Sequence, residues 1–371
     1  MSNSPLTDWT VVVPVVALVA LVFSWGRDLP PVAVALVALC LGGAVLAAVH
    51  HAEVVAHRVG EPFGSLVLAV AVTVIEVALI VTLMADGGDK TASLARDTVF
   101  AAVMITCNGI VGLSLLVGAL RNRVAVFNAE GSGTALATVA TLATLSLVLP
   151  TFTTSKPGPE FSTAQLAFAA VASLCLYGVF ITVQTVRHRD YFLPVDSTAD
   201  RHRAAGHPAP EDEGHAAPPT ARAALTSLGL LLVALVAVVG NAKAVSPTIE
   251  AGVARAGLPH AVVGVIIALL VLAPETLAAV RAARLDRVQT SLNLAYGSAI
   301  ASIGLTIPAI ALASVWLSGP LLLGLGPVHM VLLALTVVVS VLTIAPGRAT
   351  LLQGGVHLVL LAAYLFLAVS P

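Results

Sequence analysis

The stretch AVTVIEVALIVTLM, residues 71–84, is an apolar run with one carboxylate, Glu76, near its centre. A second stretch, VLAPETLAAV at residues 271–280, carries Glu275 in the same way. An acid at the centre of a membrane helix costs about 2.5–3.5 kcal/mol on insertion, so such acids are rare and indicate functional sites. Of the nineteen Asp and Glu residues, only these two fall well inside the predicted membrane spans.

The composition is that of a polytopic helical membrane protein. Of 371 residues, 58% are hydrophobic and 10% are charged, whereas soluble domains are about 25% charged. The net charge of −1 gives no indication of nucleic-acid binding. Cys40, Cys107 and Cys175 lie in apolar runs without metal-type spacing, so neither a disulfide framework nor a zinc site is predicted.

Eleven apolar segments are long enough to cross a bilayer, which takes about 20 residues per helix. No positive n-region precedes the first one, which is therefore predicted to be retained. The predicted spans are 9–26, 31–49, 63–84, 98–120, 134–150, 163–186, 223–242, 258–280, 294–316, 327–345 and 352–369. The hydrophilic connection 187–222, rich in Pro, Ala, His and charge, separates the sixth span from the seventh.

The predicted fold class is therefore an all-α membrane protein with one leading helix and two five-helix units. The leading helix lies in residues 1–30, the first unit in 31–186, the linker in 187–222 and the second unit in 223–371. The helices that carry the two acids are five crossings apart, so they cross in opposite directions. Two such units are typical of inverted-repeat transporters, whose cations bind where the repeats meet near the midplane.

The distribution of basic residues predicts the orientation. Twelve of the eighteen Lys and Arg residues fall on the side of the N-terminus and the linker, and six fall on the other side. The richer side is expected to be cytoplasmic. The prediction is a multi-pass protein of the cytoplasmic membrane, with the N-terminus and the 187–222 linker inside and the C-terminus outside.

Two carboxylates that converge in a bilayer could bind a cation and protons in turn. Hard cations such as Ca²⁺ take several oxygen ligands, and two carboxylates neutralise one divalent ion. Without the cation, desolvation and like-charge repulsion both favour protonation, so cation and protons compete for the same oxygens. Such competition permits exchange without a nucleotide, and no Walker A loop is present. The alternative is that each acid bonds a neighbouring helix or lines a structural water pocket.

Nearby polar residues are candidates for the remaining ligands. Pro274 has no N–H, so it is predicted to break its helix and free a backbone carbonyl beside Glu275. Thr73 lies three residues before Glu76 on the same helical face. In the ninth span, Ser298, Ser302 and Thr306 repeat at four-residue spacing and form one polar stripe. Small polar residues also let membrane helices pack closely, and that alternative stays open for each of them. The predicted supporting ligands are Thr73, Asn108, Ser298 and Ser302.

A cluster of histidines, HHAEVVAHR from His50 to Arg58, follows the second span. Histidine titrates near pH 6.5, so the cluster could sense pH. It could also bind a metal or simply form a solvated face at the membrane interface.

Four motifs together resemble the bacterial calcium (sodium)/proton antiporters of the calcium/cation antiporter superfamily. They are GEPFGSLVLAVAVTVIEVALI (60–80), CNGIVGLSLLVG (107–118), QTVRHRDYF (184–192) and LAPETLAAVRAARLDRVQTSLNLAYGSAIASIGLTIPAI (272–310). The resemblance implies that Glu76 and Glu275 take cation and proton alternately, and that the fourth and ninth helices bring in Asn108 and Ser298. It also implies that the first and sixth helices, with their repeat mates, slide across the core.

Two departures from the family pattern bear on selectivity. Calcium exchangers of the superfamily usually have Gly-Asn shortly before each acid, where this chain has Val72-Thr73 and Val271-Leu272. A glutamine that is common in their ninth helix is replaced by Ala301. The linker also has too few acids for an acidic calcium-sensing helix. This branch of the superfamily is associated with sodium and potassium as well as calcium.

The resulting prediction is a secondary-active antiporter, not an enzyme, that exports Ca²⁺ and could also carry Na⁺ or K⁺ in exchange for H⁺. Its expected partners are inorganic cations, protons and the lipid bilayer, with no cofactor and no nucleic acid. A homo-oligomer, the preferred cation and the proton stoichiometry stay open. The alternatives are a cation channel and a monovalent-only Na⁺(K⁺)/H⁺ antiporter. An intramembrane enzyme is disfavoured because neither an HExxH motif nor a nucleophile elbow is present.

Overall fold

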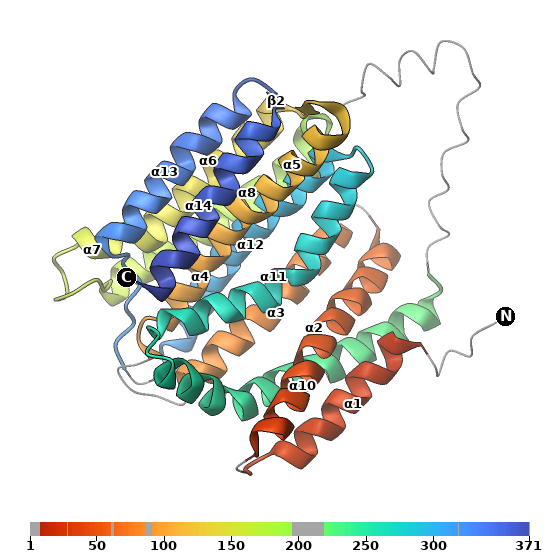
Figure 1. Ribbon diagram of the computed structural model, residues 1–371, viewed down its shortest axis with the longest axis vertical. Coiled ribbons are helices and arrows are strands. Elements are labelled where there is room, and N and C mark those ends of the chain that lie inside the picture. The colour runs from red at the N-terminus through yellow and green to blue at the C-terminus, as the bar shows by residue number, and fades with distance from the viewer. Residues whose placement is uncertain are drawn as a thin grey trace.

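The computed structural model describes residues 8–27, 29–60, 63–85, 91–194, 219–317 and 319–370. Within them, eleven helical segments lie mostly side by side (Figure 1). Three of these segments contain a π-helical stretch, and two short strands pair with each other. The elements are α1 Trp9–Ser24, α2 Pro31–Val59, α3 Phe63–Ala85, α4 Leu94–Met104 continuing through η2 Ile105–Ile110 into α5 Val111–Asn122, β1 Ala125–Val126, α6 Ala129–Ala143 continuing through η3 Thr144–Val148 into α7 Leu149–Phe152, α8 Thr163–Thr182 continuing into η4 Val183–Arg187, η5 Arg189–Phe192, α10 Ala221–Arg255, α11 Ala261–Arg284, α12 Val288–Ala313, α13 Pro327–Ile344, β2 Arg348–Ala349 and α14 Leu351–Val369.

Each of the eleven predicted spans falls on one of these segments, so the predicted all-α fold class is confirmed. Among the described residues, nine segments are long and apolar enough to cross a bilayer, and α1 and the apolar part of α3 are shorter. Two helices continue well beyond their predicted spans. Helix α2 continues to Val59, so the His50–Arg58 cluster lies on a helix. Helix α10 has 35 residues and is therefore about 50 Å long. Most of the predicted linker lies outside the described residues.

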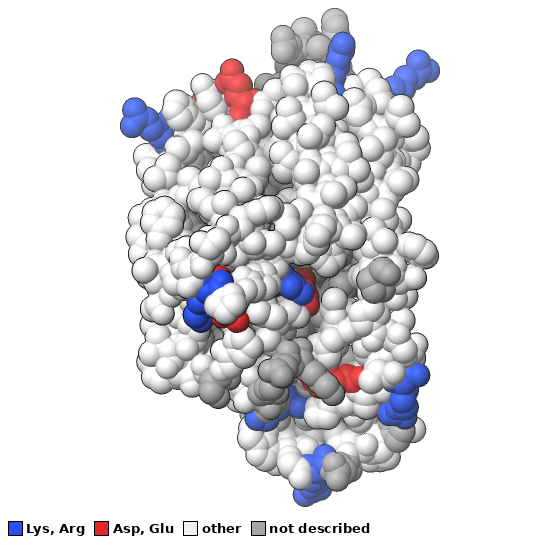
Figure 2. All heavy atoms as spheres, turned by 90° about the vertical axis from the view of Figure 1, so that its left-hand side faces the viewer, with Lys and Arg blue, Asp and Glu red and all other residues white. Residues whose placement is uncertain are grey.

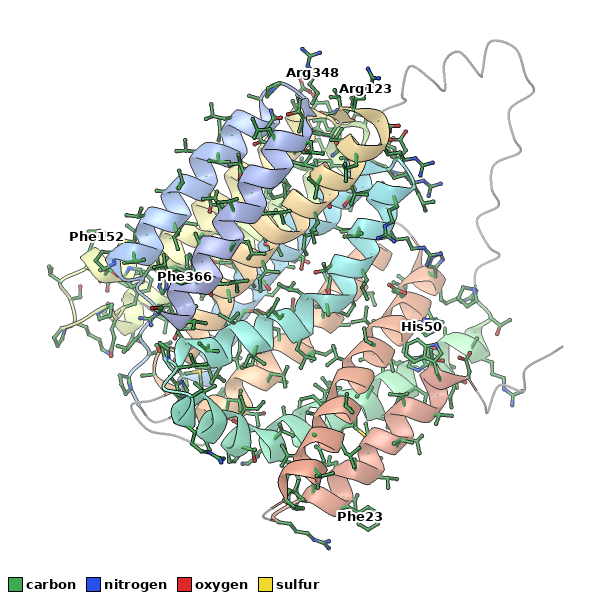
Figure 3. All side chains as sticks on the ribbon, viewed as in Figure 1. Phe23, His50, Arg123, Phe152, Arg348 and Phe366 are labelled. Carbon is green, nitrogen blue, oxygen red and sulfur yellow. The ribbon has the colours of Figure 1, made fainter. Side chains whose placement is uncertain are left out.

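The outer surface is apolar along the helices, as expected for a protein that faces lipid. Leu39 and Leu352 are each 73% exposed, and Val22 is 68% exposed. Figure 2 shows one face on which Lys, Arg, Asp and Glu form only a few separate groups. Arg123 and Arg348 lie at one end of the bundle, and Phe152 and Phe366 lie at the other (Figure 3). The chain is therefore a multi-pass membrane protein.

The helices form two packing groups with separate hydrophobic cores. The smaller group is α1, α2 and α10, which pack closely on one another. The larger group contains α4–α8 and α12–α14. Helices α3 and α11 lie between the groups and contribute side chains to both cores, as Ile75 and Ile80 of α3 illustrate. The two helices that carry the acids therefore lie where the groups meet.

Buried polar contacts tie α1 to its two neighbours. Pro14 has no N–H, so it leaves the Thr10 carbonyl without a partner inside α1. His51 Nε2 of α2 donates to that carbonyl (2.9 Å). Asn241 Nδ2 of α10 donates to the carbonyl of Ala17 (2.8 Å). These bonds satisfy polar groups that lipid cannot satisfy, and they hold α1, α2 and α10 together as one unit.

Helices of the first half pack on helices of the second half in corresponding pairs. Helix α3 packs on α12, and α11 packs on α4. In the same way, α8 packs on α12 and α14 packs on α5. Each half therefore supplies a packing partner for the acid-bearing helix of the other half.

The crossing of α5 and α14 requires glycine. A Cβ at Gly354 would lie 2.7 Å from the backbone nitrogen of Leu116, whereas a Cβ at Gly355 would meet nothing within 4 Å. We expect Gly354→Ala to lower the melting temperature of the detergent-purified protein, because overpacking costs about 1–3 kcal/mol. Gly355→Ala should leave it unchanged or slightly higher. Equal melting temperatures for the two variants would show that the helices do not approach this closely.

Candidate cation-binding site

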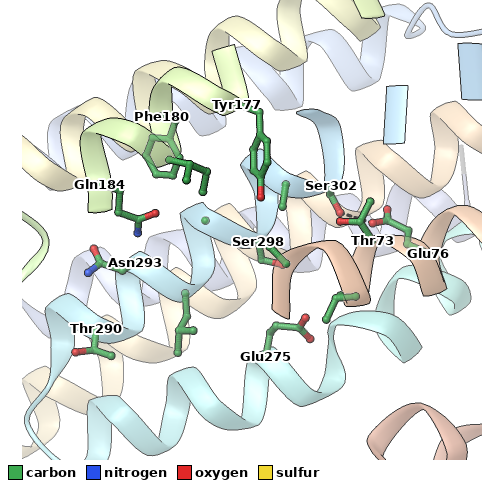
Figure 4. Close-up of a pocket in the computed structure, with 16 residues that line it drawn as sticks. Thr73, Glu76, Tyr177, Phe180, Gln184, Glu275, Thr290, Asn293, Ser298 and Ser302 are labelled. Atoms are coloured by element: carbon green, nitrogen blue, oxygen red, sulfur yellow. Dashed lines mark hydrogen bonds between the residues drawn. The ribbon is translucent and has the colours of Figure 1, made fainter. Parts of the chain in front are cut away.

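Both intramembrane acids line one cavity of about 210 Å³ between α3, α8, α11 and α12 (Figure 4). Apolar side chains form most of the remaining wall. Among the described residues that line the cavity, none is Lys, Arg or His. Its polar lining residues are Thr73, Glu76, Tyr177, Gln184, Glu275, Thr290, Asn293, Ser298 and Ser302.

Glu76 projects from the middle of α3 and is 3% exposed. The Ser302 hydroxyl of α12 donates to Glu76 Oε2 (2.6 Å) across 226 residues of sequence. The other carboxylate oxygen, Oε1, has no hydrogen-bond partner among the described residues. One oxygen of the carboxylate is therefore held in place by α12.

Glu275 enters the cavity from α11, directly after Pro274. Its Oε2 is buried without a hydrogen-bond partner among the described residues. The predicted helix break at Pro274 was wrong, because α11 is continuous from Ala261 to Arg284 with the proline inside it. Proline removes a single helical hydrogen bond, and here α11 only bends near its middle (Figure 1).

Three of the four predicted supporting residues lie with the acids. Thr73 is 5% exposed and lines the cavity one turn before Glu76. Ser298 and Ser302 line it from α12, one helical turn apart. In each helix, the face that the spacing predicted is the face that lines the cavity.

The fourth residue, Asn108, lies elsewhere, so the structure does not bring it together with the acids. Its Nδ2 donates to Thr336 Oγ1 of α13 (2.9 Å), and its Oδ1 accepts from His357 Nδ1 of α14 (3.2 Å). His357 Nε2 in turn contacts Thr343 Oγ1 (3.2 Å). Asn108 lies in the π-helical stretch η2, and its amide is occupied by this buried network.

Sequence reasoning missed the contribution of α8. Tyr177 of α8 and Gln184 of η4, which continues α8, both line the cavity. They lie seven residues apart, which is two helical turns, so they share one face. This spacing of a phenol and an amide in an apolar span was the available signal. Thr290 and Asn293, near the start of α12, were also missed.

The cavity occupies one half of the membrane-crossing bundle. Its lining residues come from the first half of α12, from the second half of α8 and from Gln184 in η4. These helix ends lie on the side of the bundle to which the 187–222 connection attaches. Asn293 Nδ2 donates to the carbonyl of Phe192, which lies near the start of that connection (2.6 Å). The cavity therefore extends from the acids toward the linker side.

The ligand atoms in the cavity suit a hard cation. Two carboxylates, several hydroxyls and side-chain amides offer only oxygen ligands to a cation, which is the preference of Ca²⁺ and similar ions. Within the described residues, no three or more His, Cys, Asp or Glu side chains gather into a group that could hold a metal ion.

Comparison with known proteins gives consistent matches. The family model described as sodium/calcium exchanger protein matches residues 29–186 and 226–370. A Sinorhizobium fredii protein named as an ionic transporter (y4hA) is 45% identical over 100% of this chain and 98% of its own. The sodium-potassium/proton antiporter ChaA of Escherichia coli is 36% identical over 96% and 95%. The crystal structure of the H⁺/Ca²⁺ exchanger CAX has a TM-score of 0.68 at 16% identity and covers 96% of this chain and 86% of its own, so it supports the fold.

Proposed function

The chain belongs to the sodium/calcium exchanger protein family, and from this premise we propose that it is a secondary-active cation/proton antiporter. It is a transporter and not an enzyme, as the sequence predicted. In the proposed mechanism, Glu76 and Glu275 bind the cation and protons alternately. The observation that carries this proposal is that two buried glutamates from different halves of the chain line one cavity, each with an oxygen that has no hydrogen-bond partner in the described part of the chain.

The alternation follows from the chemistry of the pair. A cation between the carboxylates compensates their charge in a site that excludes most water. When it leaves, the charge must be compensated in another way, and protons can do this on the same oxygens. Ser302 can donate to Glu76 in the ionised state and can accept from it in the protonated state, because a hydroxyl has both capacities.

The proposed cargo is Ca²⁺, with Na⁺ and K⁺ as additional cations. The all-oxygen ligand set supports Ca²⁺. A monovalent-only Na⁺(K⁺)/H⁺ antiporter is the second candidate. It is favoured by the similarity to the sodium-potassium/proton antiporter of Escherichia coli, which covers almost the whole chain.

Access to the acids is proposed to alternate as α1, α2 and α10 move against the larger group. Their separate core and the ties from His51 and Asn241 support a common motion of the three helices. The sixth predicted helix, α8, packs on α12 in the larger group, so it is not assigned to the moving unit. The exchange of packing partners between the halves supports the proposed pair of inverted repeats.

The proposed orientation places the linker side in the cytoplasm. Arg123 and Arg348 gather at that end (Figure 3), in agreement with the excess of basic residues counted in the sequence. The cavity then faces the cytoplasm, so the cation would be taken up there and exported while protons enter.

Inside-out vesicles from a host without its own exchangers test the proposal. The interior would be acidified, and a pH-sensitive dye would be followed after separate additions of Ca²⁺, Na⁺ and K⁺. We expect proton release on addition of at least one cation and none in vesicles that lack the protein. A response to Na⁺ and K⁺ without Ca²⁺ would favour the monovalent candidate. Cation flux that needs no proton gradient or counter-ion would favour a channel and contradict exchange.

A further inference from the structure

Helix α8 places a phenol in the cavity that the acids line. Tyr177 is 4% exposed, and its hydroxyl is buried without a hydrogen-bond partner among the described residues. Figure 4 shows the hydroxyl directed into the cavity, toward Ser298. A buried polar atom without a partner costs free energy, so one that faces a cavity calls for a ligand.

Packing, not hydrogen bonding, fixes the position of this phenol. A Cβ at Gly304 of α12 would lie 2.9 Å from Tyr177 Cβ, so glycine is what lets α8 approach α12 at this level. Ser302, which donates to Glu76, lies only two residues before Gly304. The contact that holds the tyrosine therefore belongs to the same segment of α12 that orients the acid.

Three residues that line this cavity thus each carry a buried oxygen without a hydrogen-bond partner among the described residues: Glu76 Oε1, Glu275 Oε2 and Tyr177 Oη. They come from α3, α11 and α8. A hard cation between the two carboxylates would take further neutral oxygens to complete its ligands. A phenol supplies such an oxygen without adding charge.

Resting on the proposed function, we propose that the Tyr177 hydroxyl is an oxygen ligand of the transported cation. The cation is then bound by the phenol together with the two carboxylates. Because the phenol is neutral, the summed charge of these ligands stays at two negative charges. Helix α8, which packs on the core helix α12, then takes part in cation selection.

A second tyrosine provides a matched control. Tyr296 of α12 is 1% exposed, and its hydroxyl also lacks a partner among the described residues, but it does not line the cavity. Tyr177→Phe and Tyr296→Phe each remove one buried hydroxyl and keep the ring. A general effect of the deletion on stability should therefore appear in both variants, and an effect on cation binding only in the first.

The test measures the half-saturating concentrations of Ca²⁺, Na⁺ and K⁺ in the vesicle assay, and their binding to the purified full chain by titration calorimetry. Tyr177→Phe is expected to raise the half-saturating concentration of the transported cation roughly tenfold, since one bond to a charged group is lost. The maximal rate should change much less, and Tyr296→Phe should match the parent.

The outcomes separate this inference from the function on which it rests. If the parent exchanges cations in a Glu76-dependent way while Tyr177→Phe keeps parental half-saturating concentrations and calorimetric affinities, the tyrosine is not a ligand. The same holds if both Phe variants weaken binding equally. If the parent binds and exchanges no cation, the proposed function fails and this inference fails with it.

Discussion

Replacing Glu76 with glutamine is expected to abolish cation-driven proton exchange, with a loss of more than about 100-fold in rate at any cation concentration. The amide keeps the size of the side chain and can still bond the Ser302 hydroxyl. It cannot take up a proton in place of the cation, and it leaves a bound cation without one of its two compensating charges. An unpaired charge in a buried site costs about 3–5 kcal/mol, which accounts for the expected loss. The vesicle dye assay measures it.

A carboxylate outside the cavity serves as the control. Glu250 lies on α10, where it accepts from the Ser246 hydroxyl (2.8 Å), and it does not line the cavity. Glu250→Gln should therefore exchange cations at nearly the parental rate. Melting temperatures of both purified variants would establish that they fold. A folded Glu76→Gln protein that exchanges as well as the parent would make the buried acid structural and remove the basis of the proposal.

Glu275→Gln is expected to cause a loss of similar size, while Glu275→Asp should retain part of the activity. The aspartate keeps the charge and the exchangeable proton but is one methylene shorter. Glu275 lines the cavity from α11, and its Oε2 has no hydrogen-bond partner within the described ranges. A shorter side chain should therefore weaken cation binding without ending coupling. The expected result for Glu275→Asp is a raised half-saturating concentration with proton movement that still requires the cation.

The comparison of Glu275→Gln with Glu275→Asp separates the effect of the carboxylate charge from the effect of side-chain length. Equal inactivity of the two variants would mean that position, and not charge, limits exchange. Parental activity of Glu275→Gln would mean that Glu76 alone couples the two ions, and the paired-acid mechanism would then be wrong. Calorimetric titration with the same cations shows whether a loss arises in binding or in transport.

The sequence predicted the fold class well because a membrane span is a local property of the chain. Each span must be apolar over about 20 residues, so hydropathy locates it without reference to the rest of the molecule. All eleven predicted spans fall on helical segments of the structure. The ends were less certain, because α2 and α10 continue beyond their apolar centres into stretches with histidines, charges and Pro247.

The sequence also singled out the two acids, and for the same reason. A carboxylate in the middle of an apolar run is anomalous wherever the helix packs, so Glu76 and Glu275 stand out before any contact is known. The serines and the threonine were predicted from helical spacing to one of the acids or to each other, and the structure places them in the cavity as well.

The tertiary structure alone decided which other polar side chains reach the cavity. In a helix that is apolar all round, no polar stripe in the sequence says which face meets which neighbour. Asn108 looked like a ligand, yet Thr336 and His357, more than 200 residues away, hold its amide in another part of the bundle. Tyr177 drew no attention in the sequence, yet the approach of α8 to Gly304 turns its hydroxyl into the cavity. The physical reason is that hydropathy fixes where a helix crosses the membrane, whereas only contacts with distant helices fix its rotation about its own axis.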